Sequence, residues 1–225
     1  TILYSCIICF LHVIVQSYQR ISMRLLSISL GKSGPLFGLN HPDYSSVASA
    51  INKKPVSTLS QATPVEIKSL GVVGDEQADL SVHGGLEKAI YVYSIEHYAF
   101  WNELLNRETK QIVNLQPGSM GENFTIEGLL EDAVFVGDKM TIGELEFTVV
   151  KLREPCFKFN AKMKYKGAAK AMLQSGKSGW YLRVNKPGML AAGAQIDLTP
   201  GQRITSIASQ NKALFQRGNQ KDLWN

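Results

Sequence analysis

Residues 133–152 read AVFVGDKMTIGELEFTVVKL, and this stretch decides the fold class. Three runs of mostly apolar and β-branched residues are separated by two glycine–acid pairs, Gly137-Asp138 and Gly143-Glu144. Such pairs are typical of tight turns between neighbouring strands. The stretch therefore predicts three short strands, at residues 133–136, 139–142 and 145–152.

Similar short strands are expected on both sides of this stretch. They lie at residues 23–30, 54–61, 65–73, 89–94, 124–126, 180–185 and 195–198. Helical spacing of Tyr98, Trp101 and Leu105 predicts a helix after the strand at 89–94, and residues 165–174 are expected to form another that ends near Gly176. Many short strands with few helices predict a mostly β (α+β) protein, a β-barrel with a few helical insertions.

Length and composition bound the organisation of the chain. Its 225 residues, 44% hydrophobic and 19% charged, suit one domain with a small appendage. We assign residues 23–200 to the barrel domain. From Arg203 onward the pattern turns helical, so residues 201–225 are expected to begin a C-terminal helical appendage.

The net charge and the number of cysteines limit the expected classes of binding partner and the expected cellular compartment of the protein. The net charge of +5 would permit nucleic-acid binding, but the excess gathers around Cys156 and no nucleic-acid-binding motif is present, so no nucleic-acid partner is expected. Three cysteines do not make a disulfide framework in a chain of this length. These features predict a protein of the reducing cytoplasm.

Residues 1–22 differ from the rest of the chain. The run ILYSCIICFLHVIV at 2–15 is almost entirely apolar, yet it is shorter than the roughly 20 residues that a membrane-spanning helix needs. It also lacks the charged start and small-residue cleavage site of a signal peptide. We interpret 1–22 as a leader outside the fold, with membrane attachment expected only if that leader is native. Its Cys6/Cys9 pair has no matching second pair of zinc ligands.

Cys156 is the most informative single residue. It follows a proline in the most basic part of the chain, where Glu154 is the single acid among the basic residues Lys151, Arg153, Lys158, Lys162, Lys164, Lys166 and Lys170. Nearby positive charge stabilises a thiolate, which binds soft metals or attacks electrophiles. The same charges can hold a phosphate, so one site could bind an anionic cofactor and its metal.

Two glycine-rich loops are further candidates. Residues 71–89, GVVGDEQADLSVHGGLEKA, could form an anion-binding concavity from backbone N–H groups, or an ordinary solvated turn. Residues 118–124 form the second loop, in which Asn123 could hydrogen-bond a heterocycle or merely cap the turn.

Arg183 lies between apolar residues of an expected strand. This position suggests a buried anionic partner, with a guanidinium that points to solvent as the alternative.

Several common catalytic schemes lack their signatures. The chain contains no G-x-S-x-G, Walker A, G-x-G-x-x-G or H-E-x-x-H motif. A cysteine hydrolase would need Cys156 beside His83 or His97, a contact on which the sequence is silent.

Taken together, the segments resemble the MOSC family (molybdenum cofactor sulfurase C-terminal domain), and most closely its YiiM-type members. The motifs that carry the resemblance are, in chain order, residues 74–79 and 82–85, Lys88-Ala89, Tyr93, residues 96–98, Trp101, residues 121–123, Pro155-Cys156, Lys158, Asn160, Gly179-Trp180 and Arg183-Val184. One such motif would carry little weight, but the ordered set covers about residues 23–200.

The resemblance implies a β-barrel that binds the molybdenum cofactor, a pterin dithiolene with a terminal phosphate, through Cys156 as the metal ligand. It also implies a set of cofactor contacts at matching positions: His83, Gly84, Gly85, Lys88, Asn123, Arg153, Lys158, Asn160 and Arg183.

Related members reduce N-hydroxylated compounds, including hydroxylaminopurines, to amines. The resemblance thus implies a molybdenum-dependent oxidoreductase in which Cys156 binds the metal and Asp75, His83 and Glu122 are candidate proton sources. Since the chain has no flavin or iron–sulfur motif, electrons are expected from a separate reductase; a homodimer is also expected. The alternatives are a carrier that holds the cofactor, or a persulfide on Cys156, without turnover, and an anion-binding barrel with a structural cysteine.

Overall fold

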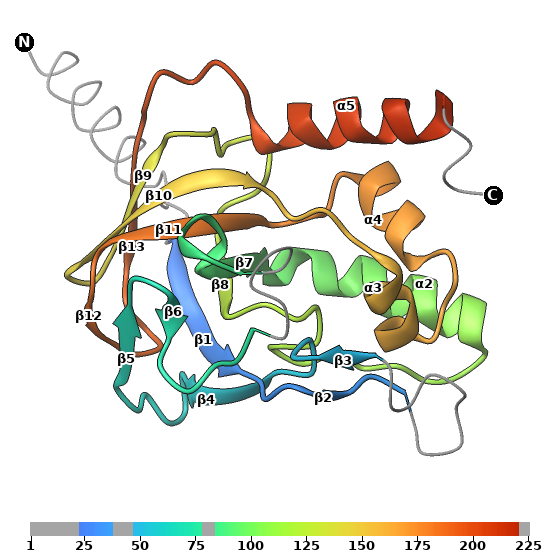
Figure 1. Cartoon of the computed structure of the whole chain (residues 1–225), viewed down its shortest axis with the longest axis horizontal. Helices are drawn as coiled ribbons and strands as arrows, with labels where there is room; N and C mark the ends of the chain where they lie inside the picture. The colour runs from blue at the N-terminus through green and yellow to red at the C-terminus, as the bar shows by residue number, and fades with distance from the viewer. Residues whose placement is uncertain (1–22, 38–46, 78–83, 221–225) are drawn as a thin grey trace, which may run out of the picture.

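A central sheet of eight strands organises the computed structural model, which describes residues 23–37, 47–77 and 84–220 (Figure 1). Its strands are β1 (Arg24–Leu30), β4 (Lys54–Thr58), β7 (Ile90–Ser94), β8 (Phe124–Glu127), β9 (Lys139–Ile142), β10 (Leu145–Leu152), β11 (Trp180–Lys186) and β13 (Ile196–Thr199). They lie in the order β13-β9-β10-β11-β7-β8-β1-β4. All neighbours are antiparallel except β7 and β8, which are parallel.

The sheet curls so that the chain around its edge strand β13 comes beside the start of β1, a curvature that Figure 1 shows. The backbone N–H of Leu25 in β1 donates to Ala194, just before β13, at 3.0 Å, and the N–H of Ile196 donates to Met23 at 2.9 Å. Two smaller sheets flank this barrel-like body: β12 (Gly188–Leu190), β5 (Val65–Lys68) and β6 (Gly71–Val72) form one, and β2 (Gly34–Pro35) and β3 (Ala48–Ser49) form the other. The expected mostly β (α+β) barrel is confirmed.

The hairpin expected from residues 139–152 is confirmed. Strands β9 and β10 have the expected bounds and pair from Leu145 opposite Ile142 across a turn in which Gly143 has a φ of +59°. The strand expected at 133–136 is wrong, because Phe135 makes only an isolated bridge to Ser206. The Asp138 carboxylate holds this segment as a turn by accepting the backbone N–H of Phe135 at 3.1 Å.

Two other expected elements have different bounds. The strand expected at 65–73 is two strands, β5 and β6, which pair with each other across a turn at residues 69–70. The helix expected at 165–174 begins later and runs as α4 (Ala168–Ser175). It ends as expected, with Gly176 in the left-handed conformation.

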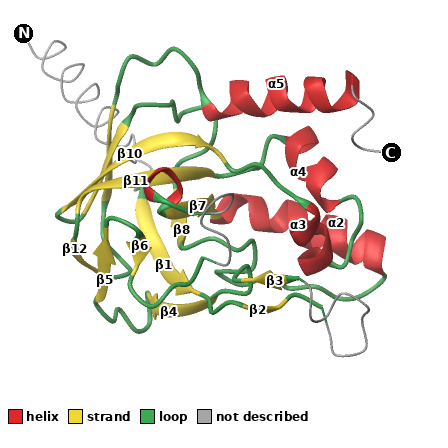
Figure 2. Cartoon of the chain, in the orientation of Figure 1, coloured by secondary structure: helices red, strands yellow, loops and turns green. Residues whose placement is uncertain are grey.

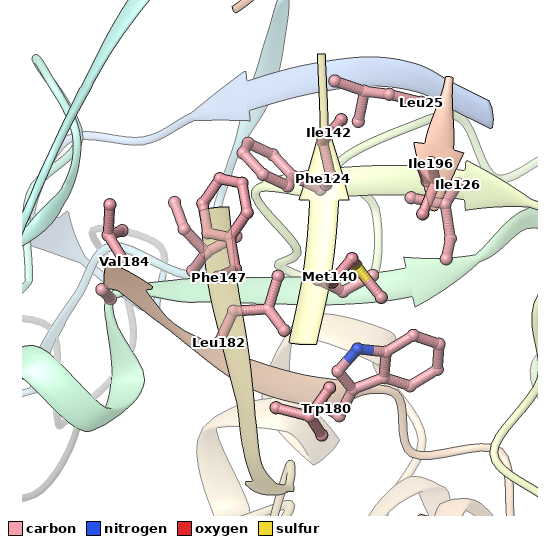
Figure 3. Close-up of a cluster of buried hydrophobic side chains, with 14 of the residues drawn as sticks. Leu25, Phe124, Ile126, Met140, Ile142, Phe147, Trp180, Leu182, Val184 and Ile196 are labelled. Carbon is pink, nitrogen blue, oxygen red and sulfur yellow. The ribbon is translucent and has the colours of Figure 1, made fainter. Parts of the chain in front are cut away.

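Aromatic and aliphatic side chains from many strands fill the barrel (Figure 3). Trp180, Phe124 and Phe147 are fully buried, and the two phenylalanine rings meet edge to face with centroids 5.9 Å apart. Each fully buried side chain of this size contributes about 1.5–3 kcal/mol relative to exposure. This core fixes the strand ends from which the site residues project.

Helices gather at one end of the barrel and pack through a second apolar cluster (Figure 2). They are α2 (Tyr98–Thr109), α3 (Phe157–Met163) and α4, preceded by the short 3-10 turns η1 (Leu86–Lys88) and η2 (Ile95–His97). Trp101 of α2 meets Phe159 of α3 edge to face at 5.5 Å. This cluster fixes α3 against the barrel.

The expected C-terminal helical segment is α5 (Ile207–Gln220). Gln210 Oε1 accepts the backbone N–H of Leu152 at 2.8 Å, and Asn211 Nδ2 donates to Ser178 Oγ at 2.7 Å. The helix is therefore tied to the end of β10 and to the loop before β11. Within the described ranges, no helix combines the length and apolar character needed to cross a membrane; the leader at 1–22 lies outside those ranges.

Gly179→Ala is expected to destabilise the barrel strongly. Gly179 has a φ of +63°, and a Cβ there would lie 2.2 Å from the Val92 carbonyl oxygen of β7. Relieving such a clash should cost about 3 kcal/mol. The matched control is Gly176→Ala, where φ is +73° but no atom lies within 4 Å of the new Cβ, so left-handed strain alone should cost about 1 kcal/mol. Urea unfolding followed by circular dichroism measures both, and equal losses would contradict the packing argument.

Candidate functional site

Cys156 lies in the connection between β10 and α3 (Figure 1). Glu154 precedes a proline, which favours extended backbone, and the chain then reaches the start of α3 with Cys156 at φ −132° and ψ 178°. The Cys156 carbonyl accepts the N–H of Phe159 at 2.9 Å, and its thiol is free and partly exposed. The cysteine is therefore held on a defined backbone with its sulfur accessible.

A pocket opens beside Cys156 and draws its lining from segments far apart in the sequence. The lining residues are Ser49, Ala50, Ile51, Lys53, Asp75, Glu76, Gln77, Lys88, Tyr91, Gly121, Asn123, Arg153, Glu154, Cys156, Lys158 and Tyr181. The structure thus brings together six residues that the sequence singled out: Asp75, Lys88, Asn123, Arg153, Cys156 and Lys158.

Arg153 is a buried cation in the pocket wall. It is only 6% exposed, and its guanidinium lies 4.6 Å from the ring centroid of Phe159 and 5.4 Å from that of Tyr91. No carboxylate in the described part of the chain forms an ion pair with it, and the adjacent Glu154 pairs with Lys151 at 2.5 Å instead. A buried guanidinium is stabilised by an anion that it can hydrogen-bond, so this wall favours an anionic ligand.

Tyr181 lines the pocket next to Arg153. Desolvation raises the pKa of its hydroxyl, and the positive charge of the Arg153 guanidinium opposes this shift. Lys158 also lines the pocket, and its Nζ donates to the Ala48 carbonyl at 3.0 Å. The lining therefore includes cationic and aromatic side chains.

The lining also contains a second buried charged group, an ion pair. Lys53 Nζ is 2.5 Å from both carboxylate oxygens of Asp75, and the two side chains are 8% and 6% exposed. Asp75 also accepts the N–H of Gly31 at 2.7 Å and Asn123 Nδ2 at 2.8 Å. Burial lowers the pKa of Lys53, although Asp75 opposes that shift.

Asn123 is locked by this network rather than left open to a ligand. Its Oδ1 accepts the backbone N–H of Tyr91 at 3.1 Å, while its Nδ2 donates to Asp75 and to the Ser29 carbonyl. Its amide therefore ties β7 to the segment that carries Asp75.

Sequence reasoning missed Lys53, Tyr91 and Tyr181. Lys53 forms its ion pair with a residue 22 positions away, so no local pattern announces it. Tyr91 and Tyr181 read as ordinary strand residues and become pocket walls because β7 and β11 pair with these two residues opposite each other.

Glu122 does not reach the pocket lining. It is fully buried, and its carboxylate accepts the hydroxyls of Tyr98 and Thr125 and the backbone N–H groups of Gly118 at 2.8 Å and Met120 at 2.9 Å. Burial raises the pKa of Glu122. Glu122 was expected to be a proton source, but in the structure its carboxylate stabilises the turn before β8.

Two more expected contacts lie outside the lining. Asn160 Oδ1 accepts the N–H of Ala169 at 2.7 Å and so joins α3 to α4. The prediction of a buried anionic partner for Arg183 is wrong. The Arg183 side chain projects from an exposed position of β11, where it is 45% exposed and pairs with Glu87 at 3.0 Å.

The expected glycine concavity is only partly described. Gly85 has a φ of +87°, and its N–H donates to Gln77 Oε1 at 3.1 Å, whereas His83 lies outside the described residues. Of the two histidines considered for a cysteine hydrolase, His97 is buried with its Nε2 2.7 Å from Glu131. His97 is thus engaged by Glu131 and does not line the pocket that contains Cys156.

Comparison with known proteins identifies the family. The model of the MOSC domain matches residues 79–197, more than half of the chain. The chain belongs to the MOSC domain family. It is 34% identical over 189 residues to the uncharacterized protein YflK of Bacillus subtilis, a match that spans 84% of this chain and 79% of YflK.

A solved structure places this MOSC protein with the YiiM type. YiiM from Geobacillus stearothermophilus superposes with a TM-score of 0.65 at 31% identity, over 87% of this chain and 85% of that one. A protein of Gibberella moniliformis named Reductase is 35% identical over 136 residues, which are 60% of this chain but only 24% of that longer protein.

Glu122→Ala is expected to lower stability by about 3 kcal/mol, since it leaves the buried N–H groups of Gly118 and Met120 without their acceptor. The control is Glu103→Ala on the exposed face of α2, which should change stability by less than about 0.5 kcal/mol. Guanidinium unfolding by tryptophan fluorescence compares the two variants. Wild-type stability in Glu122→Ala would contradict the structural role.

Proposed function

We propose that this MOSC protein binds the molybdenum cofactor in the pocket beside Cys156 and reduces N-hydroxylated compounds to amines. The observation that carries the proposal is the presence, in one pocket, of an accessible free cysteine and a buried arginine without a carboxylate partner among the described residues. The family membership supports the same assignment, because MOSC domains are generally associated with this cofactor.

The chemistry of the lining fits such a cofactor. In the described ranges, no group of three or more His, Cys, Asp and Glu side chains could hold a metal ion. A metal that arrives within an organic cofactor needs only one protein ligand, and a thiolate suits a thiophilic metal. Cys156 is therefore the residue that would bind it.

The remaining lining residues suit an anionic, flat ligand. Arg153 would hold a phosphate through its planar set of N–H donors, and Lys158 and Lys88 add positive charge. Tyr91 and Tyr181 offer aromatic surface against which a flat ring system can pack. Asn123 acts indirectly, since its amide holds the Asp75 carboxylate and the Tyr91 backbone in place.

The bound cofactor would supply two-electron redox chemistry. The net reaction is R–NH–OH plus two electrons and two protons, giving R–NH₂ and water, so the protein must position the substrate and deliver protons. The similarity to a segment of a longer protein named Reductase supports an electron-transfer function. A separate reductase as electron donor and a homodimer stay predictions.

Elemental analysis of wild type and Cys156→Ser tests the proposal. Wild type, purified from a host that makes the cofactor, should contain molybdenum and reduce N-hydroxylaminopurine with reduced methyl viologen as donor. Cys156→Ser should lack both properties while keeping its circular dichroism spectrum. Equal molybdenum content in the two proteins would contradict the assignment of Cys156 as the metal ligand. Bound pterin without turnover would favour the carrier alternative.

In Arg153→Met, the amount of bound pterin is expected to fall by about 10-fold or more relative to wild type, because a charge-assisted contact of this kind contributes roughly 1.5–3 kcal/mol. Arg107→Met, on an exposed arginine of α2, is the charge-matched control and should load normally. Fluorescence of the oxidised pterin released from each protein measures loading. Normal loading of Arg153→Met would contradict the phosphate-binding role of Arg153.

A further inference from the structure

The Lys53–Asp75 pair is buried inside the pocket, where it would face a bound substrate. The two side chains come from the segment before β4 and the turn after β6, and both line the same cavity as Cys156. Asp75 accepts hydrogen bonds from Gly31, Lys53 and Asn123. These donors engage both carboxylate oxygens, so Asp75 holds its neighbours in place and presents no free oxygen to a substrate, as the proton source that the sequence suggested would have to.

Several other proton-bearing groups of the lining are weaker candidates than Lys53. The Tyr91 hydroxyl donates to the Ser178 carbonyl at 2.8 Å, and Lys158 donates to Ala48. Arg153 does not release a proton in proteins. Desolvation raises the pKa of Tyr181, which makes its hydroxyl a weaker acid. Lys53 is a buried ammonium in this lining that can lose a proton.

The charged surroundings of Lys53 favour its use as an acid. Burial lowers its pKa, while Asp75 and Glu122 oppose the shift, and Lys162 of α3 adds a like charge nearby. The other charged residues around the pocket are Glu76, Lys88, Arg153, Glu154 and Lys158. The ammonium therefore stays paired with Asp75 at rest, yet releases a proton more readily than a solvent-exposed lysine.

We propose that Lys53 is the proton donor that converts the departing hydroxyl group of the substrate to water, and that Asp75 is the positioning residue that aims its ammonium. The inference rests on the proposed function. As the N–O bond breaks, two electrons come from the external donor, one proton passes from Lys53 Nζ to the leaving oxygen, and solvent water supplies the proton that the nitrogen gains. Lys53 is left as a neutral amine beside Asp75 and is reprotonated from solvent.

The first test uses protein without cofactor. Lysine side chains carrying ¹³C at Cε are followed by NMR as pH rises, and the Lys53 signal is identified by its loss in Lys53→Met. It should titrate below the ordinary lysine value of 10.5, and Lys54→Met, at an exposed neighbour, is the matched control for assigning the signal. A Lys53 signal that titrates with the exposed lysines would overturn the proposal.

Stability provides an independent measure of the same proton. Because the folded pKa of Lys53 lies below the unfolded value, the unfolded chain binds more protons between the two, and stability rises with pH across that window. Wild type should therefore gain stability relative to Lys53→Met as pH approaches 10.5. A constant difference for Lys53→Met would contradict the burial of a protonated amine.

The second test uses the loaded enzyme with reduced methyl viologen as donor. Lys53→Arg, which keeps a positive charge beside Asp75, should keep wild-type molybdenum but lose at least about 100-fold in kcat, since a guanidinium does not release a proton. Lys53→Met should lose at least as much. Ethylamine added to Lys53→Ala should restore part of the rate, which a purely structural role of Lys53 would not allow. Lys54→Met should behave as wild type.

The outcomes separate the two proposals. A loaded wild type that reduces no N-hydroxylated compound overturns the proposed function, and the donor role with it, even if the NMR titration is as expected. An active wild type with full kcat in Lys53→Met, or a loss of rate confined to His83→Ala or Lys88→Met, overturns the donor role of Lys53 and leaves the proposed function standing.

Discussion

The Asp75 carboxylate is the constraint on which the pocket depends. It joins the end of β1 through Gly31, the segment before β4 through Lys53 and the turn before β8 through Asn123. Asn123 then extends the link to Tyr91 in β7. Breaking one partner of such a buried pair leaves an uncompensated charge, which costs about 3–5 kcal/mol. The network therefore both shapes the cavity and keeps its polar groups aligned.

The two buried cations of the pocket, Lys53 and Arg153, are compensated by different partners. Lys53 is paired with a carboxylate, whereas Arg153 lies against the aromatic faces of Phe159 and Tyr91. Aromatic faces compensate a desolvated cation only in part. An anionic ligand would complete that compensation, and by binding the folded state it would also stabilise the protein.

Sequence patterns predicted those features that depend on neighbouring residues. The β9–β10 hairpin follows from alternation around a glycine turn, and the end of α4 follows from a glycine in the left-handed conformation. The motif order likewise placed Asp75, Asn123, Arg153 and Cys156 in one site, although their partners could not be predicted. Arg183 and Glu122 had equally suggestive positions, but one faces solvent and the other is enclosed by a turn.

By itself, the sequence predicted the barrel class, because strand patterns and turn chemistry are local properties, and an ordered set of motifs carried the resemblance to the family. It also singled out Cys156, a cysteine among basic residues, as a candidate ligand for a soft metal. Only the tertiary structure decided which polar groups share the cavity and in what state. Burial and ion pairing arise between segments far apart in the chain, as when Lys53 meets Asp75 and Arg153 finds aromatic rings instead of a carboxylate. A proton donor is defined by those surroundings, and no pattern in a linear chain contains them.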